Sequence, residues 1–163
     1  MIEAIVFDLD GTLVRFPIDY ETLFEEFRRI MGVCEVHPVV EVVSRTDGKT
    51  RELVFNAWDR AELAVASNTV VNEEGMKTYI EFFEKPKALV TLQGKKVVEV
   101  VLKQFGMEFD TIVTREDTLF RTEQLKIAIA QLDVEAGNVL FVGDTEGDAA
   151  AAGKTGCKFL KVK

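Results

Sequence analysis

Short apolar segments alternate with amphipathic segments along most of the chain, and this alternation limits the folds open to it. Five segments rich in β-branched and aromatic residues are predicted strands: 3–7, 88–91, 109–113, 138–142 and 157–162. Several are apolar on consecutive residues, as strands buried on both faces are. Helical patterns separate the later strands, at 97–105, at 125–132 and around 148–152. We therefore expect an α/β fold, a doubly wound parallel sheet with helices on both faces.

Residues 15–86 interrupt this alternation. Apolar residues recur there at helical spacing in 23–31, 53–64 and 76–83, with Asp19 and Asn72 as N-caps. The Val-rich segment 38–44 is predicted to be a further helix, although valine favours strands. The sequence thus predicts two domains. Residues 1–14 plus 87–163 form the α/β core domain with the active site, and residues 15–86 form a small inserted all-helical domain.

Composition excludes several classes of partner. The chain has 163 residues, 47% of them hydrophobic, which is enough for one core and a small second domain. Its net charge of -8, without a basic block, argues against nucleic acid and anionic membranes. No apolar run reaches the length of a membrane span, and the first residues lack the basic start of a secretory signal. We expect a cytoplasmic protein, monomeric or homodimeric.

Acidic residues follow two of the predicted strands directly. In IVFDLDGTL, residues 5–13, Asp8 and Asp10 come after a strand and precede Gly11. In NVLFVGDTEGD, residues 138–148, Asp144 and Asp148 follow another strand. Asp-x-Asp-Gly is also typical of an ordinary turn. However, loops at the carboxyl ends of strands form the binding crevice of an open α/β sheet, so both pairs are candidate site residues.

Four carboxylates at one crevice would require a cation. At an effective dielectric of about 20, two such charges at close range repel by about 4 kcal/mol. Oxygen ligands with an incomplete shell suit Mg²⁺, which takes water and substrate phosphate oxygens as its remaining ligands. The sequence therefore predicts a Mg²⁺ site where these two loops meet.

Taken together, these motifs resemble the haloacid dehalogenase superfamily of aspartate-nucleophile phosphotransferases, over essentially the whole chain. The first family motif corresponds to residues 8–12, DLDGT, and the fourth to residues 143–148, GDTEGD. The second, a Thr or Ser that ends the next strand, corresponds to Thr91. The resemblance implies that the strands before the first and fourth motifs are neighbours. It also implies that residues 15–86 are the family's helical cap.

The third motif departs from the family pattern. The family has a Lys near the start of the helix before the fourth-motif strand, and an ungapped comparison puts Arg121 there. Arginine keeps the charge and can donate two parallel hydrogen bonds to phosphate. Lys126, further along the same helix, is the alternative. Leu92 is a second departure, since a polar Asn is common after the second motif.

The resemblance also implies a mechanism. Asp8 is expected to be the nucleophile that forms an aspartyl-phosphate, and Asp10 the general acid and base. An acid at this place favours phosphoryl transfer over dehalogenation, because a departing halide needs no proton. The implied Mg²⁺ ligands are Asp8, the backbone carbonyl of Asp10, Asp144, and Asp148 either directly or through water. The implied phosphate-binding residues are Thr91, Arg121 and Gly11.

The expected function is hydrolysis of a small phosphorylated metabolite, a phosphomonoester such as a sugar phosphate or phosphoglycolate. Two alternatives stay open at this point. One is a phosphomutase of the same superfamily. The other is a non-catalytic module with a degenerate third motif, which would bind metal or phosphate without turnover.

Overall fold

The central sheet has five parallel strands. The computed structural model describes all residues, 1–163. The strands have the spatial order β5-β4-β1-β6-β7, so that β1 is central. Their bounds are β1 Ala4–Phe7, β4 Lys87–Val90, β5 Thr111–Val113, β6 Val139–Gly143 and β7 Lys158–Lys161. The predicted α/β fold is confirmed, and so is the predicted pairing of the two strands that precede the acidic loops.

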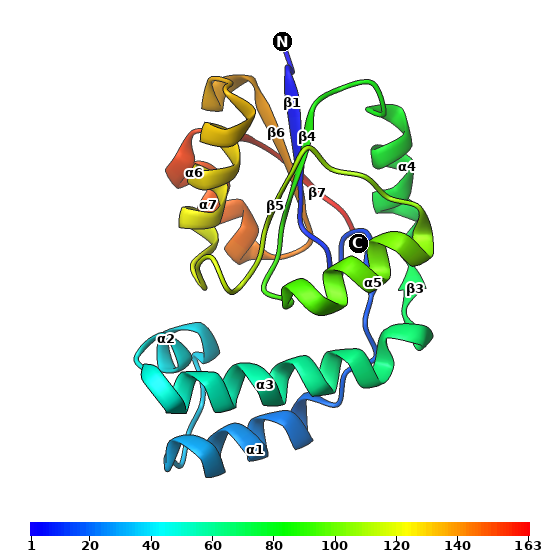
Figure 1. The fold of residues 1–163 in the computed structure, drawn as a ribbon. Coiled ribbons are helices and arrows are strands. Elements are labelled where there is room, and N and C mark those ends of the chain that lie inside the picture. The colour runs from blue at the N-terminus through cyan, green and yellow to red at the C-terminus, as the bar shows by residue number, and fades with distance from the viewer.

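Helices cover both faces of the sheet (Figure 1). On one face lie α6 (Arg121–Leu132) and α7 (Glu146–Thr155), and on the other lie α4 (Glu73–Glu81) and α5 (Lys95–Phe105). Along β1, Ile5 and Phe7 belong to the core under α4 and α5, whereas Ala4 and Val6 belong to the core under α6 and α7. All four side chains are fully buried, which explains why the strand is apolar at every position.

Three helices form a separate layer beyond the carboxyl end of the sheet (Figure 1): α1 (Tyr20–Met31), α2 (Val39–Ser44) and α3 (Gly48–Val65). They share a core that includes Phe27, Val54 and Trp58. The Asp19 carboxylate accepts a hydrogen bond from Thr22 N at 3.1 Å and caps α1, as the sequence predicts. We call this three-helix layer the cap.

Two short antiparallel strands connect the cap to the core. They are β2 (Val14–Arg15) and β3 (Val70–Val71), and each has only two residues, too few for a sequence signal. Short 3₁₀ turns lie at Ala66–Asn68 and Ala136–Asn138.

Helix α4 packs differently from the prediction, which assigned it to the inserted domain. Its Tyr79 ring lies 5.9 Å from the Phe7 ring, and Tyr79 Oη donates a hydrogen bond to the Glu108 carbonyl at 3.2 Å. A side chain at Gly75 would lie 1.8 Å from the Thr12 carbonyl oxygen, so glycine lets the helix approach the loop after β1. The predicted boundary at residue 86 therefore includes one helix that belongs to the core by its packing.

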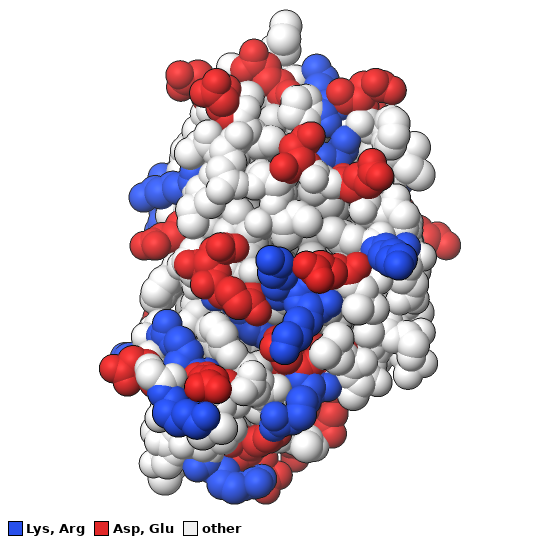
Figure 2. All heavy atoms as spheres, viewed as in Figure 1, with Lys and Arg blue, Asp and Glu red and all other residues white.

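The surface carries charges of both signs. Figure 2 shows Lys and Arg side chains scattered among Asp and Glu side chains over this face, without a broad basic region. No helix is both long enough and apolar enough to cross a membrane.

A buried ion pair network fastens the cap to the core. Arg115 follows β5, is fully buried, and pairs with Asp59 and, at 2.8 Å, with Glu62, both on α3. Glu62 also accepts a hydrogen bond from Gly94 N, at the start of α5, at 3.1 Å. The guanidinium carbon lies 4.5 Å from the centre of the Trp58 ring. Burial raises the pKa of Glu62 to about 7, while the Arg115 charge opposes this shift.

Removing the Arg115 charge should destabilise the protein strongly. Arg115→Met keeps the bulk of the side chain but leaves the buried Glu62 carboxylate without its counter-ion, while Asp59 keeps Lys96 at 3.8 Å. We expect the free energy of unfolding to fall by about 3–5 kcal/mol, measured by urea denaturation. Adding Glu62→Leu should restore part of the loss, because one unpaired charge is then gone.

The matched control is Arg60→Met. Arg60 pairs with Glu26 on the cap surface at 2.7 Å, and its side chain is 65% exposed. Exposed pairs of this kind contribute at most about 1 kcal/mol. Equal effects of the two substitutions would contradict the role assigned to Arg115.

Candidate active site

The order of the strands brings two distant loops together. Strands β1 and β6 are adjacent and parallel, with Phe7 opposite Val142. The next residues along each strand therefore emerge at the same edge of the sheet, and Asp8 N donates a hydrogen bond to the Val142 carbonyl at 3.0 Å. This pairing places Asp8 beside the loop that carries Asp144.

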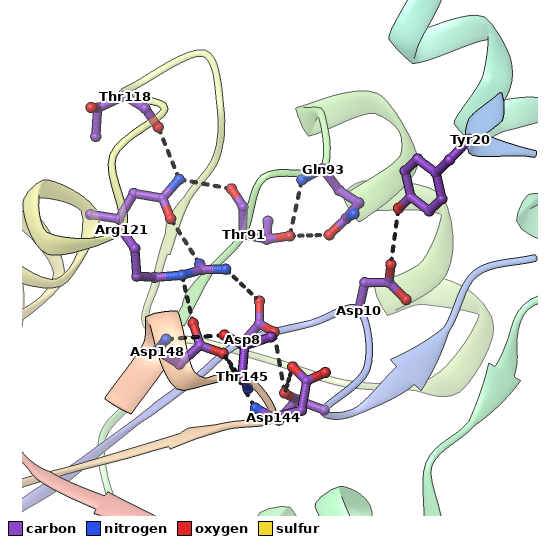
Figure 3. Close-up of polar contacts among 12 residues, drawn as sticks. Asp8, Asp10, Tyr20, Thr91, Gln93, Thr118, Arg121, Asp144, Thr145 and Asp148 are labelled. Carbon is purple, nitrogen blue, oxygen red and sulfur yellow. Dashed lines mark hydrogen bonds and ion pairs between the residues drawn. The ribbon is translucent and has the colours of Figure 1, made fainter. Parts of the chain in front are cut away.

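Three carboxylates converge at this edge (Figure 3). Asp8, Asp144 and Asp148 each offer an oxygen, and these oxygens lie within 4.8 Å of one another. The Thr12 hydroxyl lies 3.2 Å from Asp8 Oδ2 and 3.1 Å from Asp144 Oδ1. We call Asp8, Asp144 and Asp148 the acid cluster.

The start of α7 fixes the position of Asp148. Thr145 Oγ1 accepts a hydrogen bond from Asp148 N at 3.0 Å, and Asp148 Oδ2 accepts one from Thr145 N at 3.3 Å. This reciprocal capping box holds the carboxylate at the helix N-terminus, where the helix dipole favours a negative charge.

Arg121 lies against the acid cluster (Figure 3). It is the first residue of α6, and its Nη2 is 2.9 Å from Asp8 Oδ1 while its Nε is 3.0 Å from Asp148 Oδ1. The side chain of Lys126, the alternative for the third motif, is exposed to solvent. The geometry therefore brings Arg121, and not Lys126, to the acids.

Gln124 orients Arg121, although the sequence did not distinguish it as a site residue. Its Oε1 accepts a hydrogen bond from Arg121 Nη1 at 2.8 Å. Its Nε2 donates to the backbone carbonyls of Thr91 and Thr118 at 2.8 and 2.9 Å. The one available signal was spacing, because residues three apart share a helix face.

The acid cluster carries more negative charge than Arg121 offsets. Burial raises the pKa of Asp8 well above its ordinary value, Arg121 opposes this shift, and the charges of Asp148 and Asp144 add to it. The cluster therefore favours a proton or a further cation. Its donors are all carboxylate oxygens, the ligand type that Mg²⁺ prefers, so the residues present fit the predicted ion.

The side chain of Asp10 faces the cap instead of the acid cluster. Its Oδ1 accepts a hydrogen bond from Phe16 N at 3.1 Å, and its Oδ2 accepts one from Tyr20 Oη at 3.2 Å. Burial raises the pKa of Asp10, and these hydrogen bonds oppose the shift. Tyr20, which opens α1, was not a predicted site residue, and nothing in the sequence distinguished it from other cap aromatics.

Gly11 makes room for Asp144. Its φ of 83° is a left-handed conformation that glycine adopts readily. A side chain there would lie 2.2 Å from Asp144 Oδ2. Substitution at this position would therefore displace a member of the acid cluster.

Thr91 is fully buried at the end of β4 and hydrogen-bonds to Gln93. Gln93 N in turn donates to Thr91 Oγ1 at 3.1 Å. Leu92 and Gln93 line the pocket above the acids, whereas Thr91 is not among the lining residues. The phosphate-binding role of Thr91 stays a prediction.

A pocket of about 220 Å³ lies between the acids and the cap. The lining residues that come from the core domain are Asp8, Asp10, Leu92, Gln93, Arg121, Asp144, Thr145 and Asp148. Its cap lining consists of Tyr20, Phe24, Val39, Val40 and Trp58. A larger hollow of about 520 Å³ lies beside α4 at the amino end of β4. We assign the chemistry to the smaller pocket, because it alone contains the acid cluster.

Known proteins resemble this chain along almost its full length. The sequence profile described as "Haloacid dehalogenase-like hydrolase" matches residues 5–162. A phosphoglycolate phosphatase of Neisseria gonorrhoeae is 24% identical over 183 aligned positions, which span 96% of this chain and 78% of the relative.

Two solved structures share the fold. A haloacid dehalogenase-like hydrolase of Streptococcus pneumoniae matches with a TM-score of 0.73 and 20% identity, over 99% of this chain and 85% of the other. CbbY of Rhodobacter sphaeroides, in complex with phosphate, matches with a TM-score of 0.68 and 21% identity, over 98% of this chain and 85% of the other.

Mg²⁺ should stabilise the folded protein through the acid cluster. At one hundred times its dissociation constant, the ion is expected to add about 2.7 kcal/mol to the free energy of unfolding, measured by thermal or urea denaturation. Asp144→Asn should lose most of this increment. Without the ion, the variant should be at least as stable as the unchanged protein, because one repelling charge is gone.

The matched control is Asp133→Asn, remote from the cluster, at a residue with a φ of 56° that asparagine also tolerates. It should keep the full Mg²⁺ increment. An increment that survives in Asp144→Asn would contradict the assigned ligand set.

Proposed function

The chain belongs to the haloacid dehalogenase-like hydrolase family, and we propose that it is a Mg²⁺-dependent phosphatase that hydrolyses a small phosphomonoester through an aspartyl-phosphate. One observation carries the proposal. The oxygens of Asp8, Asp144 and Asp148 lie within 4.8 Å of one another, with Arg121 beside them in a pocket. The phosphatase name of the Neisseria gonorrhoeae relative supports the same class of reaction.

Asp8 is the proposed nucleophile. An oxygen of its carboxylate attacks phosphorus, and the bond between phosphorus and the leaving-group oxygen breaks. Water then attacks the phosphorus of the aspartyl-phosphate, which releases inorganic phosphate and restores the carboxylate. Two displacements replace one difficult step. Asp8 is 4% exposed, so little water competes with the substrate for its oxygens.

Asp10 is the proposed general acid and base. It protonates the departing oxygen in the first step and accepts a proton from the attacking water in the second. Its raised pKa suits this task, because burial keeps a larger fraction of the carboxyl protonated. Tyr20 is a positioning residue, since its hydroxyl donates to Asp10 Oδ2 and holds the side chain in place.

The remaining polar groups hold the phosphoryl group. When the substrate binds, Arg121 is proposed to donate its hydrogen bonds to phosphoryl oxygens instead of to Asp8 and Asp148. Gln124 holds the guanidinium in position. Mg²⁺ would be held by Asp8, the Asp10 carbonyl, Asp144 and Asp148. When bound, it supplies positive charge that offsets the charge of the phosphate. The Thr91 hydroxyl is a further proposed phosphate ligand.

Asp8→Asn should abolish turnover. An amide oxygen is a poor nucleophile, so we expect the hydrolysis of 4-nitrophenyl phosphate with Mg²⁺ to fall by at least about 10³-fold. Release of 4-nitrophenol measures the rate, and Asp133→Asn serves as the control with unchanged activity. Activity that survives in Asp8→Asn would exclude Asp8 as the nucleophile. Mg²⁺ binding without turnover in the unchanged protein would favour a non-catalytic module.

Asp10→Asn should affect substrates according to their leaving groups. A departing alkoxide needs a proton, whereas 4-nitrophenolate is stable without one. The loss in kcat/KM should therefore reach about 10²–10⁴-fold for an alkyl phosphate and be much smaller for 4-nitrophenyl phosphate. Equal losses for the two substrates would contradict the role of Asp10 as the acid.

A further inference from the structure

We propose that the organic group of the substrate is small, uncharged and largely apolar, and that the pocket selects against a second anionic group. The inference rests on the proposed function, because it identifies the acid cluster as the phosphoryl end of the pocket. It concerns the opposite end, where the cap meets the leaving group.

The cap contributes only uncharged side chains to the pocket. They are the two rings of Tyr20 and Phe24, the indole of Trp58, and the side chains of Val39 and Val40 on α2. Leu92 extends this surface from the core side, at the position where the family commonly has a polar residue. Apolar and aromatic walls favour a ligand whose own surface is apolar.

No cation in the pocket is available to a second anion. Arg121 is the only basic residue of the lining, and it already pairs with Asp8 and Asp148 at 2.9 and 3.0 Å. A carboxylate or second phosphate on the leaving group would lose water against the uncharged cap lining and find no cation there. Burial of an unpaired charge in such surroundings is strongly unfavourable.

The basic residues next to the pocket lining also have acidic partners within the protein. Arg115 lies against the Trp58 ring but pairs with Asp59 and Glu62. His37 packs edge-on against the Phe24 ring, with 5.1 Å between ring centres, and its Nδ1 lies 2.9 Å from Glu35 Oε1. Neither side chain belongs to the pocket lining.

One neutral donor remains for a polar atom of the leaving group. Gln93 uses its Oε1 toward Thr91, and its amide nitrogen donates to no protein group (Figure 3). An uncharged hydroxyl or carbonyl oxygen matches such a donor without adding charge. Trp58 Nε1 does not serve this purpose, because it is shielded from the pocket.

The pocket is also small. Its volume of about 220 Å³ is below the range of about 300–1,000 Å³ that is usual for sites of drug-sized ligands. After the phosphoryl group is accommodated, only a few non-hydrogen atoms of the leaving group can lie under the cap.

A matched pair of substrates tests the inference. 2-Phosphoglycolate and its primary amide have nearly the same shape and differ in one negative charge. We expect kcat/KM to favour the amide by at least about tenfold. The dissociation constants of both compounds for Asp8→Asn, measured by calorimetry, should show the same preference without turnover. Val40→Lys should lower the ratio of kcat/KM for the amide to kcat/KM for the carboxylate, because it adds a cation to the pocket lining. Val40→Gln, similar in length but neutral, should leave this ratio unchanged.

The outcomes separate this inference from the proposed function. The inference would be overturned if the unchanged protein had a kcat/KM for 2-phosphoglycolate at least equal to that for the amide, and if Asp8→Asn bound both compounds equally tightly. That result would leave the phosphatase proposal intact. Absence of turnover of both compounds and of 4-nitrophenyl phosphate would contradict the proposed function. The calorimetric comparison would then still decide whether the pocket rejects the second charge.

Discussion

Repulsion among buried carboxylates is the constraint on which the arrangement of this protein depends. Asp8 and Asp144 come from loops more than 130 residues apart in sequence, and the parallel pairing of β1 with β6 forces them to the same edge. Their charges oppose that approach. Arg121 offsets part of the repulsion, and the N-terminus of α7, next to Asp148, offsets a further part. The remaining negative charge favours a cation at this edge of the sheet, and we propose that a divalent cation bound there allows a phosphoryl group to approach.

We propose that the cap makes this site selective. Arg115 pairs with Asp59 and Glu62 of the cap, while the side chains that the cap presents to the acids are uncharged. Charged side chains therefore contact the Trp58 ring outside the pocket lining, whereas uncharged cap side chains line the pocket. Tyr20 joins the two parts, because a cap residue holds the side chain of Asp10. In the proposed mechanism this hydrogen bond couples the position of the cap to proton transfer by Asp10.

Much of this could be predicted from the sequence, for identifiable physical reasons. Consecutive apolar residues indicated the buried strands, and acids at strand ends indicated where the strands meet, so the sequence predicted that Asp8, Asp144 and Asp148 lie close together, as they do. Helix α4 was assigned to the wrong layer, because an amphipathic pattern defines a buried face but not its partner. Gln124 and Glu62 were missed, because a polar residue in a helix resembles one on a solvent-exposed face. Only tertiary structure shows that both are buried.

The most direct test is a crystal structure of the protein with Mg²⁺ and beryllium fluoride, which mimics a phosphoryl group on a carboxylate. The account predicts the fluoride adduct on a carboxylate oxygen of Asp8, with one Mg²⁺ shared by Asp8 and Asp144 and with Arg121 turned toward the adduct. An unmodified Asp8 with the ion bound elsewhere, or two loops that move apart when the ion is added, would contradict it.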